Sequence, residues 1–121
     1  MKRAKLFRAS VPSEFVTLKV CETFLDKFLG LMFSKALAED RGLILVEKRE
    51  SRLNTCIHML FVNYDITVLW LDSQKVVVDK VLAKKWHLFY CPRKPAKYVV
   101  ELHPSKFQDY ALGDQLELLY E

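Results

Sequence analysis

Residues 57–72 read Ile57-His58-Met59-Leu60-Phe61-Val62-Asn63-Tyr64-Asp65-Ile66-Thr67-Val68-Leu69-Trp70-Leu71-Asp72. Apolar side chains occupy both alternating faces of 55–62 and 66–71, which is typical of central strands that are covered on both sides. The polar residues 63–65 between them favour a turn. We therefore predict a hairpin of two buried strands at the centre of the fold.

The rest of the chain predicts more strands and one main helix. Thr23 lies three residues before Asp26, an approximate capping box, and apolar residues at helical spacing follow it, so we predict a helix over 23–35. Residues 104–110 could add one or two helical turns that begin at a proline. A loop is expected over 83–96, with a possible short strand at 86–90. Further strands are expected at 16–20, 42–46, 76–82, 97–102 and 115–120.

These elements predict an α+β domain that is mostly β. About seven strands should form a strongly curved antiparallel sheet or a small open barrel, because hairpins connect most of them, and one helix should pack on it. We expect the core to include Phe24, Phe28, Leu31, Met32, Leu60, Val68, Trp70, Val78 and Val99.

Composition sets the class of protein. A chain of 121 residues with 51% hydrophobic residues is one folded domain. We expect a basic N-terminal arm over 1–13 and a single domain over 14–121. No apolar run is long enough to span a membrane, and no signal-peptide pattern follows the charged start. Three widely spaced cysteines favour reduced thiols and a cytoplasmic location.

Four short motifs occur in order along most of the chain, from about residue 16 to residue 118. They are Gly30-Leu31-Met32, Gly42-Leu43-Ile44-Leu45, the stretch 57–72, and Ala96-Lys97-Tyr98-Val99-Val100-Glu101-Leu102 followed by Leu112-Gly113-Asp114. In this order they resemble the domain-of-unknown-function 192 family of bacteria and archaea. The resemblance implies a fold group and no particular activity, since function depends on the site and not on the fold.

The chain departs from the family pattern at three points. The family usually has Asp where Thr67 follows Ile66, Gly in the turn where this chain has Ser73-Gln74-Lys75, and a small residue and Gly where Ser105-Lys106 stand. One carboxylate and two glycines are therefore missing. The resemblance implies that this chain lacks part of any polar site that the family shares.

Cys56 and His58 could carry chemistry. On a strand, residues two apart point to the same face, so both side chains could meet Cys91 as zinc ligands, with His87 as a further candidate. The same residues could form a Cys-His nucleophile pair. Neither a second finger-like pair nor an oxyanion loop accompanies them. We favour a buried cysteine and a hydrogen-bonded histidine over both alternatives.

Aromatic and basic residues alternate in the segment 80–97. Together with a pI near 9.0 and a net charge of +4, this pattern suits stacking on single-stranded nucleic acid. It equally suits an aromatic cluster that caps the open end of a curved sheet, which we favour because no RNA-binding signature is present.

Three carboxylates interrupt or end apolar strands. We expect Asp79 to face solvent on an edge strand, Asp72 to bond its own turn, and Glu101 to pair with a nearby lysine. If Asp79 instead lies on an apolar face, it needs a partner or a raised pKa.

The leading functional hypothesis is a small non-enzymatic ligand-binding or interaction module that needs no cofactor. Its partner would be a small molecule or a protein. A metal protein or enzyme using Cys56, His58 and Cys91 is the first alternative, and a nucleic-acid binder using 80–97 is the second. The expected ligand or partner surface comprises His58, Lys84, Lys85, Trp86, Phe89, Tyr90, Arg93 and Lys94.

Overall fold

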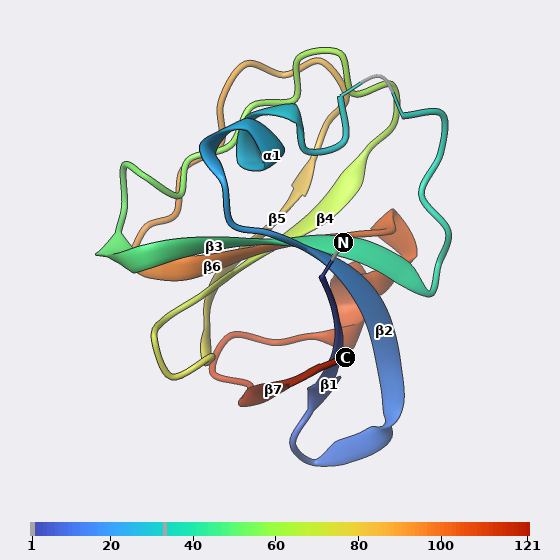
Figure 1. Cartoon of the computed structure of the whole chain (residues 1–121), viewed down its shortest axis with the longest axis vertical. Helices are drawn as coiled ribbons and strands as arrows, with labels where there is room; N and C mark the ends of the chain where they lie inside the picture. The colour runs from blue at the N-terminus through green and yellow to red at the C-terminus, as the bar shows by residue number, and fades with distance from the viewer. Residues whose placement is uncertain (1, 33) are drawn as a thin grey trace.

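A computed structural model of the chain describes residues 2–32 and 34–121, and it describes Phe24, Leu25 and Phe28 by their backbone only. The described residues form seven strands, a short α-helix and a 3-10 helix (Figure 1). In chain order these are β1 (Arg3–Arg8), β2 (Val11–Cys21), α1 (Phe24–Leu29), β3 (Arg41–Ser51), β4 (Ile66–Leu71), β5 (Val77–Ala83), β6 (Ala96–Leu102), η1 (Pro104–Asp109) and β7 (Leu116–Tyr120).

The strands form one mixed sheet in the order β5-β4-β6-β3-β2-β1-β7. Among the described residues, five of the six strand pairings are antiparallel, and β2 with β3 is parallel because α1 lies in the connection between them. The residues just before β5 and β7 meet at an isolated bridge between Val76 and Gln115, but the two strands do not pair along their described lengths, so the described sheet is not closed. The fold is therefore mostly β, as predicted, and most of the pairing is antiparallel. The described sheet is mixed and neither closed nor strongly curled, so the prediction of a strongly curved sheet or small open barrel was wrong.

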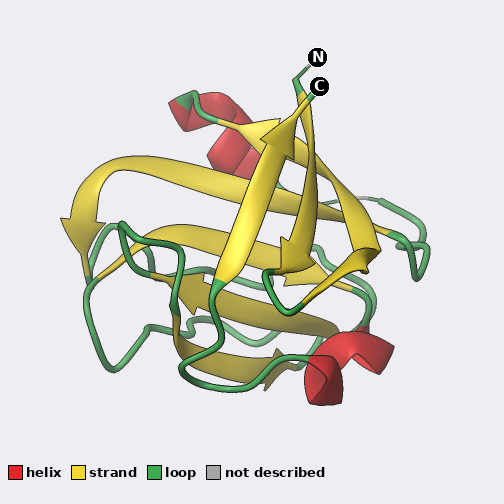
Figure 2. Ribbon diagram, turned by 90° about the horizontal axis from the view of Figure 1, so that it is seen from below, coloured by secondary structure: helices red, strands yellow, loops and turns green. Residues whose placement is uncertain are grey.

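The predicted N-terminal arm was wrong as well. Strand β1 pairs with β2 on one side and β7 on the other, and Ala4 and Leu6 are fully buried. The alternation of Ala4 and Leu6 with Arg3, Lys5 and Phe7 turns one face of this strand toward the core. The first and last strands are thus neighbours, which brings the two termini together (Figure 2).

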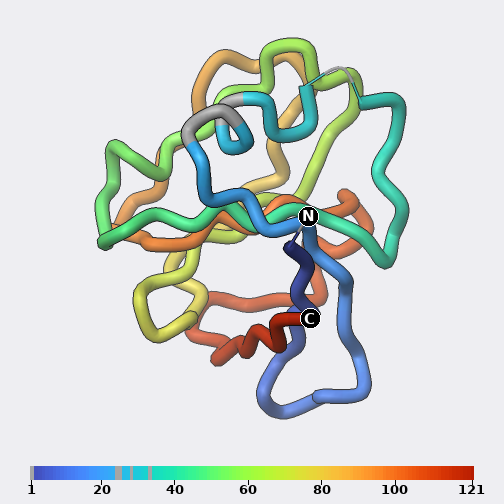
Figure 3. Tube along the Cα trace, in the orientation of Figure 1, coloured from blue at the N-terminus to red at the C-terminus, as the bar shows by residue number. Residues whose placement is uncertain are grey.

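The first half of the predicted central hairpin is not a strand. Residues 56–64 run beside 84–91 as a loop, joined by the Ile57–Tyr90 bridge and by hydrogen bonds between Met59 and the backbone of 86–87 (Figure 3). The Met59 carbonyl accepts from the Val62 N–H, and Phe61 has φ 61°, a turn geometry that a strand does not contain. Ile57, Met59 and Val62 bury their side chains by covering the sheet instead of joining it.

The main helix is shorter than predicted. The Thr23 hydroxyl accepts from the Asp26 N–H, as the capping pattern indicated, but α1 ends at Gly30. Gly30 has φ 46° and its N–H bonds the Asp26 carbonyl, so it terminates the helix where a left-handed residue is needed. The predicted turns after Pro104 are confirmed as η1.

Two hydrophobic cores lie on opposite faces of the sheet. The first fills the space between the central strands and β1, β2 and β7, and it includes Leu6, Leu18, Ile44, Val100 and Leu116. The second lies under α1 and the loops 52–64 and 84–95, and it includes Leu31, Met59, Val68, Trp70 and Val99. Strand β4 is buried along its whole length, as expected for a strand covered on both sides.

Four of the nine predicted core residues are buried, namely Leu31, Val68, Trp70 and Val99. Met32, Leu60 and Val78 are half-buried, and the side chains of Phe24 and Phe28 lie outside the described residues. No helix in the described part of the chain is long and apolar enough to cross a membrane.

Candidate ligand site

A cavity of about 310 Å³ opens in the second core, between α1 with the turn that follows it and the loop 54–62. Its walls are mostly apolar, with Leu31, Leu45, Ile57, Met59 and Val99 among the lining residues. Its polar lining residues include Lys27, Glu47, Asn54, Thr55, His58 and Glu101. An apolar pocket with a few converging polar groups is the usual form of a small-molecule site.

Glu101 is the most unusual group in this cavity. It lies in β6 among apolar neighbours, and only 6% of its surface is exposed. Its carboxyl group makes no hydrogen bond with the described residues, and its oxygen atoms are accessible from the cavity. Burial without a partner raises the pKa of Glu101 to about 7. The expected pairing of Glu101 with a lysine was therefore wrong, and the carboxyl group has acceptor capacity to spare at the cavity wall.

The strand pairing fixes where Glu101 points. It stands opposite Val68 on β4 and Leu43 on β3, and these two residues belong to the second core. Gly30 closes over it, because a Cβ on Gly30 would lie 3.9 Å from Glu101 Oε1. Helix α1 thus ends directly above the carboxyl group.

The other charged groups of the cavity neutralise each other. Lys27 Nζ lies 2.6 Å from Glu47 Oε2 and also donates to the Val46 carbonyl. Both side chains are largely buried, with 22% and 18% of their surfaces exposed. The His58 ring Nδ1 accepts a hydrogen bond from the Leu60 N–H at 3.2 Å, so the expectation of a hydrogen-bonded histidine is confirmed.

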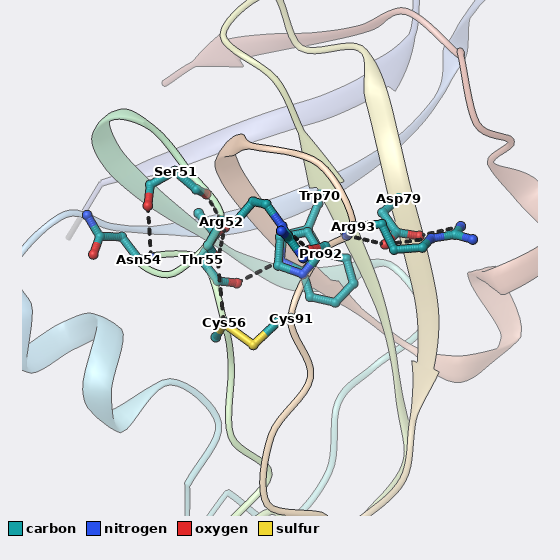
Figure 4. Close-up of a disulfide and its surroundings, with 10 residues drawn as sticks. All are labelled: Ser51, Arg52, Asn54, Thr55, Cys56, Trp70, Asp79, Cys91, Pro92 and Arg93. Carbon is teal, nitrogen blue, oxygen red and sulfur yellow. Dashed lines mark hydrogen bonds and ion pairs between the residues drawn. A yellow bond between two sulfur atoms is a disulfide. The ribbon is translucent and has the colours of Figure 1, made fainter.

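A disulfide joins Cys56 to Cys91 (Figure 4). Both the prediction of reduced thiols and the alternative of a Cys56, His58 and Cys91 zinc site were wrong for these two cysteines, because their sulfur atoms are bonded to each other. The loops 51–58 and 84–93 lie side by side, and this proximity is what makes the bond possible. Cys21 remains free and buried, and burial raises the pKa of its thiol to about 11.

The disulfide also organises the cavity wall. The Thr55 hydroxyl donates to the Ser51 carbonyl, and the Thr55 carbonyl accepts from the Trp70 indole N–H at 2.7 Å. Arg52 Nε donates to the Pro92 carbonyl, next to Cys91. Asn54, Thr55 and Cys56 therefore hold a defined position along the cavity.

Asp79 is buried, contrary to the expectation of a solvent-facing side chain, and it has a partner. Its carboxylate accepts from the Arg93 backbone N–H at 2.9 Å and from the Arg93 guanidinium at 2.9 and 3.3 Å, and Oδ1 also accepts from the Lys80 N–H (Figure 4). Burial alone would raise the pKa of Asp79, but these hydrogen bonds outweigh it and lower the pKa below 3.8. Asp72 serves its turn as predicted, accepting from the N–H groups of Gln74 and Val76.

The structure divides the predicted partner surface. His58 lies at the cavity, while the segment 84–90 runs past it on the outside of the loop 56–63. Trp86 and Phe89 are exposed, Trp86 stacks edge-on against Phe61, and the Tyr90 hydroxyl accepts from the Lys84 N–H. Lys85 and Lys94 are exposed, and Arg93 is turned toward Asp79.

Several of the basic residues in 80–97 have partners within the chain. Lys80 Nζ donates to the carbonyls of Phe107 and Tyr110, and Lys84 Nζ lies 3.5 Å from Asp65. Arg93 bonds Asp79. These contacts lower the share of the positive charge that is free to meet a polyanion.

The sequence patterns did not indicate Lys27, Glu47 or Glu101 as site residues. For Glu101 a signal was present, because it is the one charged residue in the apolar run Tyr98-Val99-Val100-Glu101-Leu102. A charge inside a strand that is buried on both faces needs a partner or a function. Lys27 and Glu47 carry no such signal, since their pairing depends on how α1 sits over β3.

The comparisons with known proteins agree with the fold. The family model DUF192, described as "Uncharacterized ACR, COG1430", matches residues 7–118. The chain belongs to the DUF192 (UPF0127) family. This confirms the resemblance derived from the four motifs, and the DUF192 family is one of uncharacterised proteins.

Relatives with the UPF0127 name come from archaea. The protein of Thermococcus kodakarensis is 46% identical over 84 residues, which cover 69% of this chain and 52% of that protein. The protein of Pyrococcus furiosus is 42% identical over 104 residues, which cover 84% of this chain and 86% of that protein. The matched region thus spans about half of the first relative and most of the second.

Two solved structures share the fold. A Sinorhizobium meliloti protein, provisionally described as a transcription regulator, superposes with a TM-score of 0.83 at 21% identity, covering 97% of this chain and 92% of that one. A protein of unknown function from Novosphingobium aromaticivorans gives 0.77 at 15% identity, covering 95% and 83%. At such identities the likeness concerns the fold alone.

Proposed function

We propose that this DUF192 chain is a small non-enzymatic binding module that holds a small molecule in the cavity beneath α1. The observation that carries the proposal is the buried Glu101 carboxyl group, which lies at the cavity wall without a hydrogen-bond partner among the described residues. Burial of such a group costs folding stability, and no hydrogen bond from the described residues offsets this cost. A ligand that bonds this group would offset the cost.

The shape of the cavity supports a small ligand. A volume of about 310 Å³ lies at the lower end of the range of ligand pockets, roughly 300–1,000 Å³. The disulfide and the Thr55 to Trp70 hydrogen bond hold one wall in place, so the site is formed before a ligand arrives. The enzymatic alternative loses its nucleophile, since Cys56 Sγ is bonded to Cys91.

The exposed aromatic residues in 84–90 would also suit contact with a protein partner. Binding to nucleic acid stays an alternative prediction. Its test is binding to a single-stranded oligonucleotide at low salt, with Lys84, Lys85, Arg93 and Lys94 changed together. Binding that weakens at higher salt and in the variant with all four residues changed would favour the nucleic-acid alternative.

We also propose a cytoplasmic location. The disulfide does not oppose it, because intracellular proteins of hyperthermophilic archaea carry disulfides, and the relatives in Thermococcus and Pyrococcus are archaeal. Fractionation of the native cells, with antibody detection of the chain in the soluble cell interior or outside it, tests this point.

The binding proposal is tested by NMR with three six-carbon probes, namely 1-hexanol, n-hexylamine and hexanoate. The expected result is saturable shifts of the backbone amides of Gly30, Ile57 and Val99 with at least one probe. A Met32→Trp variant, checked for folding by circular dichroism, fills the cavity from its half-buried rim and should abolish these shifts. If none of the probes shifts the cavity amides, the proposed function is wrong.

A further inference from the structure

We infer that the cavity selects a primary amine on a short apolar chain, with the ammonium group bound to the Glu101 carboxylate. This inference rests on the proposed function, because it assigns the ligand class of the same cavity. It follows from the hydrogen-bonding capacity of the carboxyl group, the charges around it and the walls beside it.

The hydrogen-bonding capacity comes first. An ionised carboxylate offers two oxygen atoms with about four acceptor positions and no donor. Those of Glu101 are not used by the described residues. An ammonium group has three donors and no acceptor, so it fits this group and forms charge-assisted hydrogen bonds with it.

The charge balance of the cavity favours a cation. Lys27 on α1 and Glu47 on β3 form an ion pair, so their charges cancel within the site. His58 comes from the loop 54–62. Burial is the main cause that raises the pKa values of the Tyr64 phenol and the Cys21 thiol, and the charge of nearby Glu101 raises them further. When Glu101 ionises, it is the one carboxylate among these described groups that has no cation beside it.

The apolar walls of the cavity determine which chemical group should be attached to the ammonium group. Leu31, Leu45, Ile57, Met59 and Val99 line the space around the carboxyl group. An alkyl chain gains from contact with such walls in proportion to the apolar area removed from water. A carboxylic acid would place a second negative charge beside Glu101, and an alcohol would bond it without a charge.

Protonation of Glu101 makes the selection depend on pH. Because burial holds the pKa of Glu101 at about 7, the carboxylate is the major form only above neutral pH. An alkylamine stays protonated to a much higher pH, near the value of a lysine side chain, about 10.4. Amine binding should therefore tighten as pH rises from 5 to 8, by about tenfold for each pH unit below 7.

The experiment compares dissociation constants of n-hexylamine, 1-hexanol and hexanoate at pH 8, from the NMR shifts of the cavity amides. For the unchanged protein we expect hexylamine to bind at least about tenfold more tightly than hexanol, in line with a charge-assisted pair. In Glu101→Gln the ratio of the two constants should fall to about one. Glu117→Gln, which removes an exposed carboxylate on β7, should leave the ratio as it was.

The outcomes separate this inference from the proposed function. If hexanol or hexanoate shifts the cavity amides but hexylamine binds no better, the cavity is a binding site and the amine selection is wrong. The same holds if the amine preference survives in Glu101→Gln or does not change between pH 5 and 8. If no probe binds, both the proposed function and this inference fail.

Discussion

Asp79 and Glu101 are both buried carboxylates on strands that flank β4, but they differ in their hydrogen bonding. Asp79 on β5 has 5% of its surface exposed and Glu101 on β6 has 6%. Asp79 receives hydrogen bonds from Arg93 and Lys80, whereas Glu101 receives none from the described residues and faces a cavity. Burial raises the pKa of both groups, but the hydrogen bonds to Asp79 outweigh it, so the pKa of Asp79 is lowered while that of Glu101 is raised to about 7.

The difference separates a structural carboxylate from a candidate functional one. The bonds to Asp79 pin the segment after Cys91 onto β5 and are complete without a ligand. The Glu101 carboxyl group forms no such bonds with the described residues, so its hydrogen-bonding capacity remains unused. A strongly perturbed group in a pocket is a functional candidate on physical grounds, whereas a saturated ion pair is not.

The largest effect is expected from the disulfide, which anchors both regions. Cys56 lines the Glu101 cavity, and Cys91 lies two residues before Arg93. In the chain-entropy model, removing a bond between residues separated by 35 positions should lower the free energy of unfolding by about 4 kcal/mol.

Chemical denaturation of a Cys56→Ser, Cys91→Ser double variant measures this loss. We also expect amide signals near both Glu101 and Asp79 to move. A loss below about 1 kcal/mol, or signals that move at only one of the two carboxylates, would show that the bond does not connect the two regions.

The next effect concerns Glu101 and pH. Because its pKa is raised from 4.5 to about 7, the folded state holds its proton more tightly than the unfolded state. The contribution of Glu101 to stability is therefore greatest below pH 4.5 and falls as pH rises toward 7, by about 3 kcal/mol in total. Glu101→Gln removes this dependence, so the free energy of unfolding of the variant, relative to that of the parent protein, should rise by that amount between pH 4 and pH 8. Denaturation curves at both pH values measure it, and parallel pH dependences of parent and variant would contradict the account.

A smaller effect with the opposite sign is expected at Asp79. Its pKa is lowered below 3.8, so its bonds stabilise the fold above that pH, and the contribution is lost as pH falls further. Asp79→Asn should cost about 1–2 kcal/mol at pH 7, and the cost stays modest because Arg93 is largely exposed. The cost should shrink at pH 3. A variant that is more stable than the parent at pH 7 would mean that Asp79, like Glu101, is left uncompensated.

The sequence predicted the strands well wherever periodicity decides. Residues 42–46, 66–71, 76–82, 97–102 and 115–120 lie in or overlap β3, β4, β5, β6 and β7. The pattern failed at 55–62, because the same apolar residues can lie in a strand or in a loop that covers a sheet. It also failed at 3–8, where charged residues on the outer face hid the alternation of β1.

The site was less predictable than the fold, for physical reasons. The Cys56–Cys91 bond depends on two loops that meet only in the folded chain, and their spacing of 35 residues carries no signal of it. Whether a buried carboxylate finds a cation depends on a neighbouring strand. Arg93 reaches Asp79, whereas Lys27 pairs with Glu47, and no cation among the described residues pairs with Glu101.

We propose that Glu101 is an ionisable group, buried and without a hydrogen-bond partner among the described residues, at the wall of a ligand cavity. A pH titration of the side-chain carboxyl ¹³C signals by NMR, with Glu101→Gln for assignment, tests it most directly. We predict that the Glu101 signal titrates with a pKa of about 7 and that saturating n-hexylamine lowers this pKa, because the ammonium group stabilises the carboxylate. A pKa near the ordinary value of 4.5, unchanged by the amine, would contradict the account.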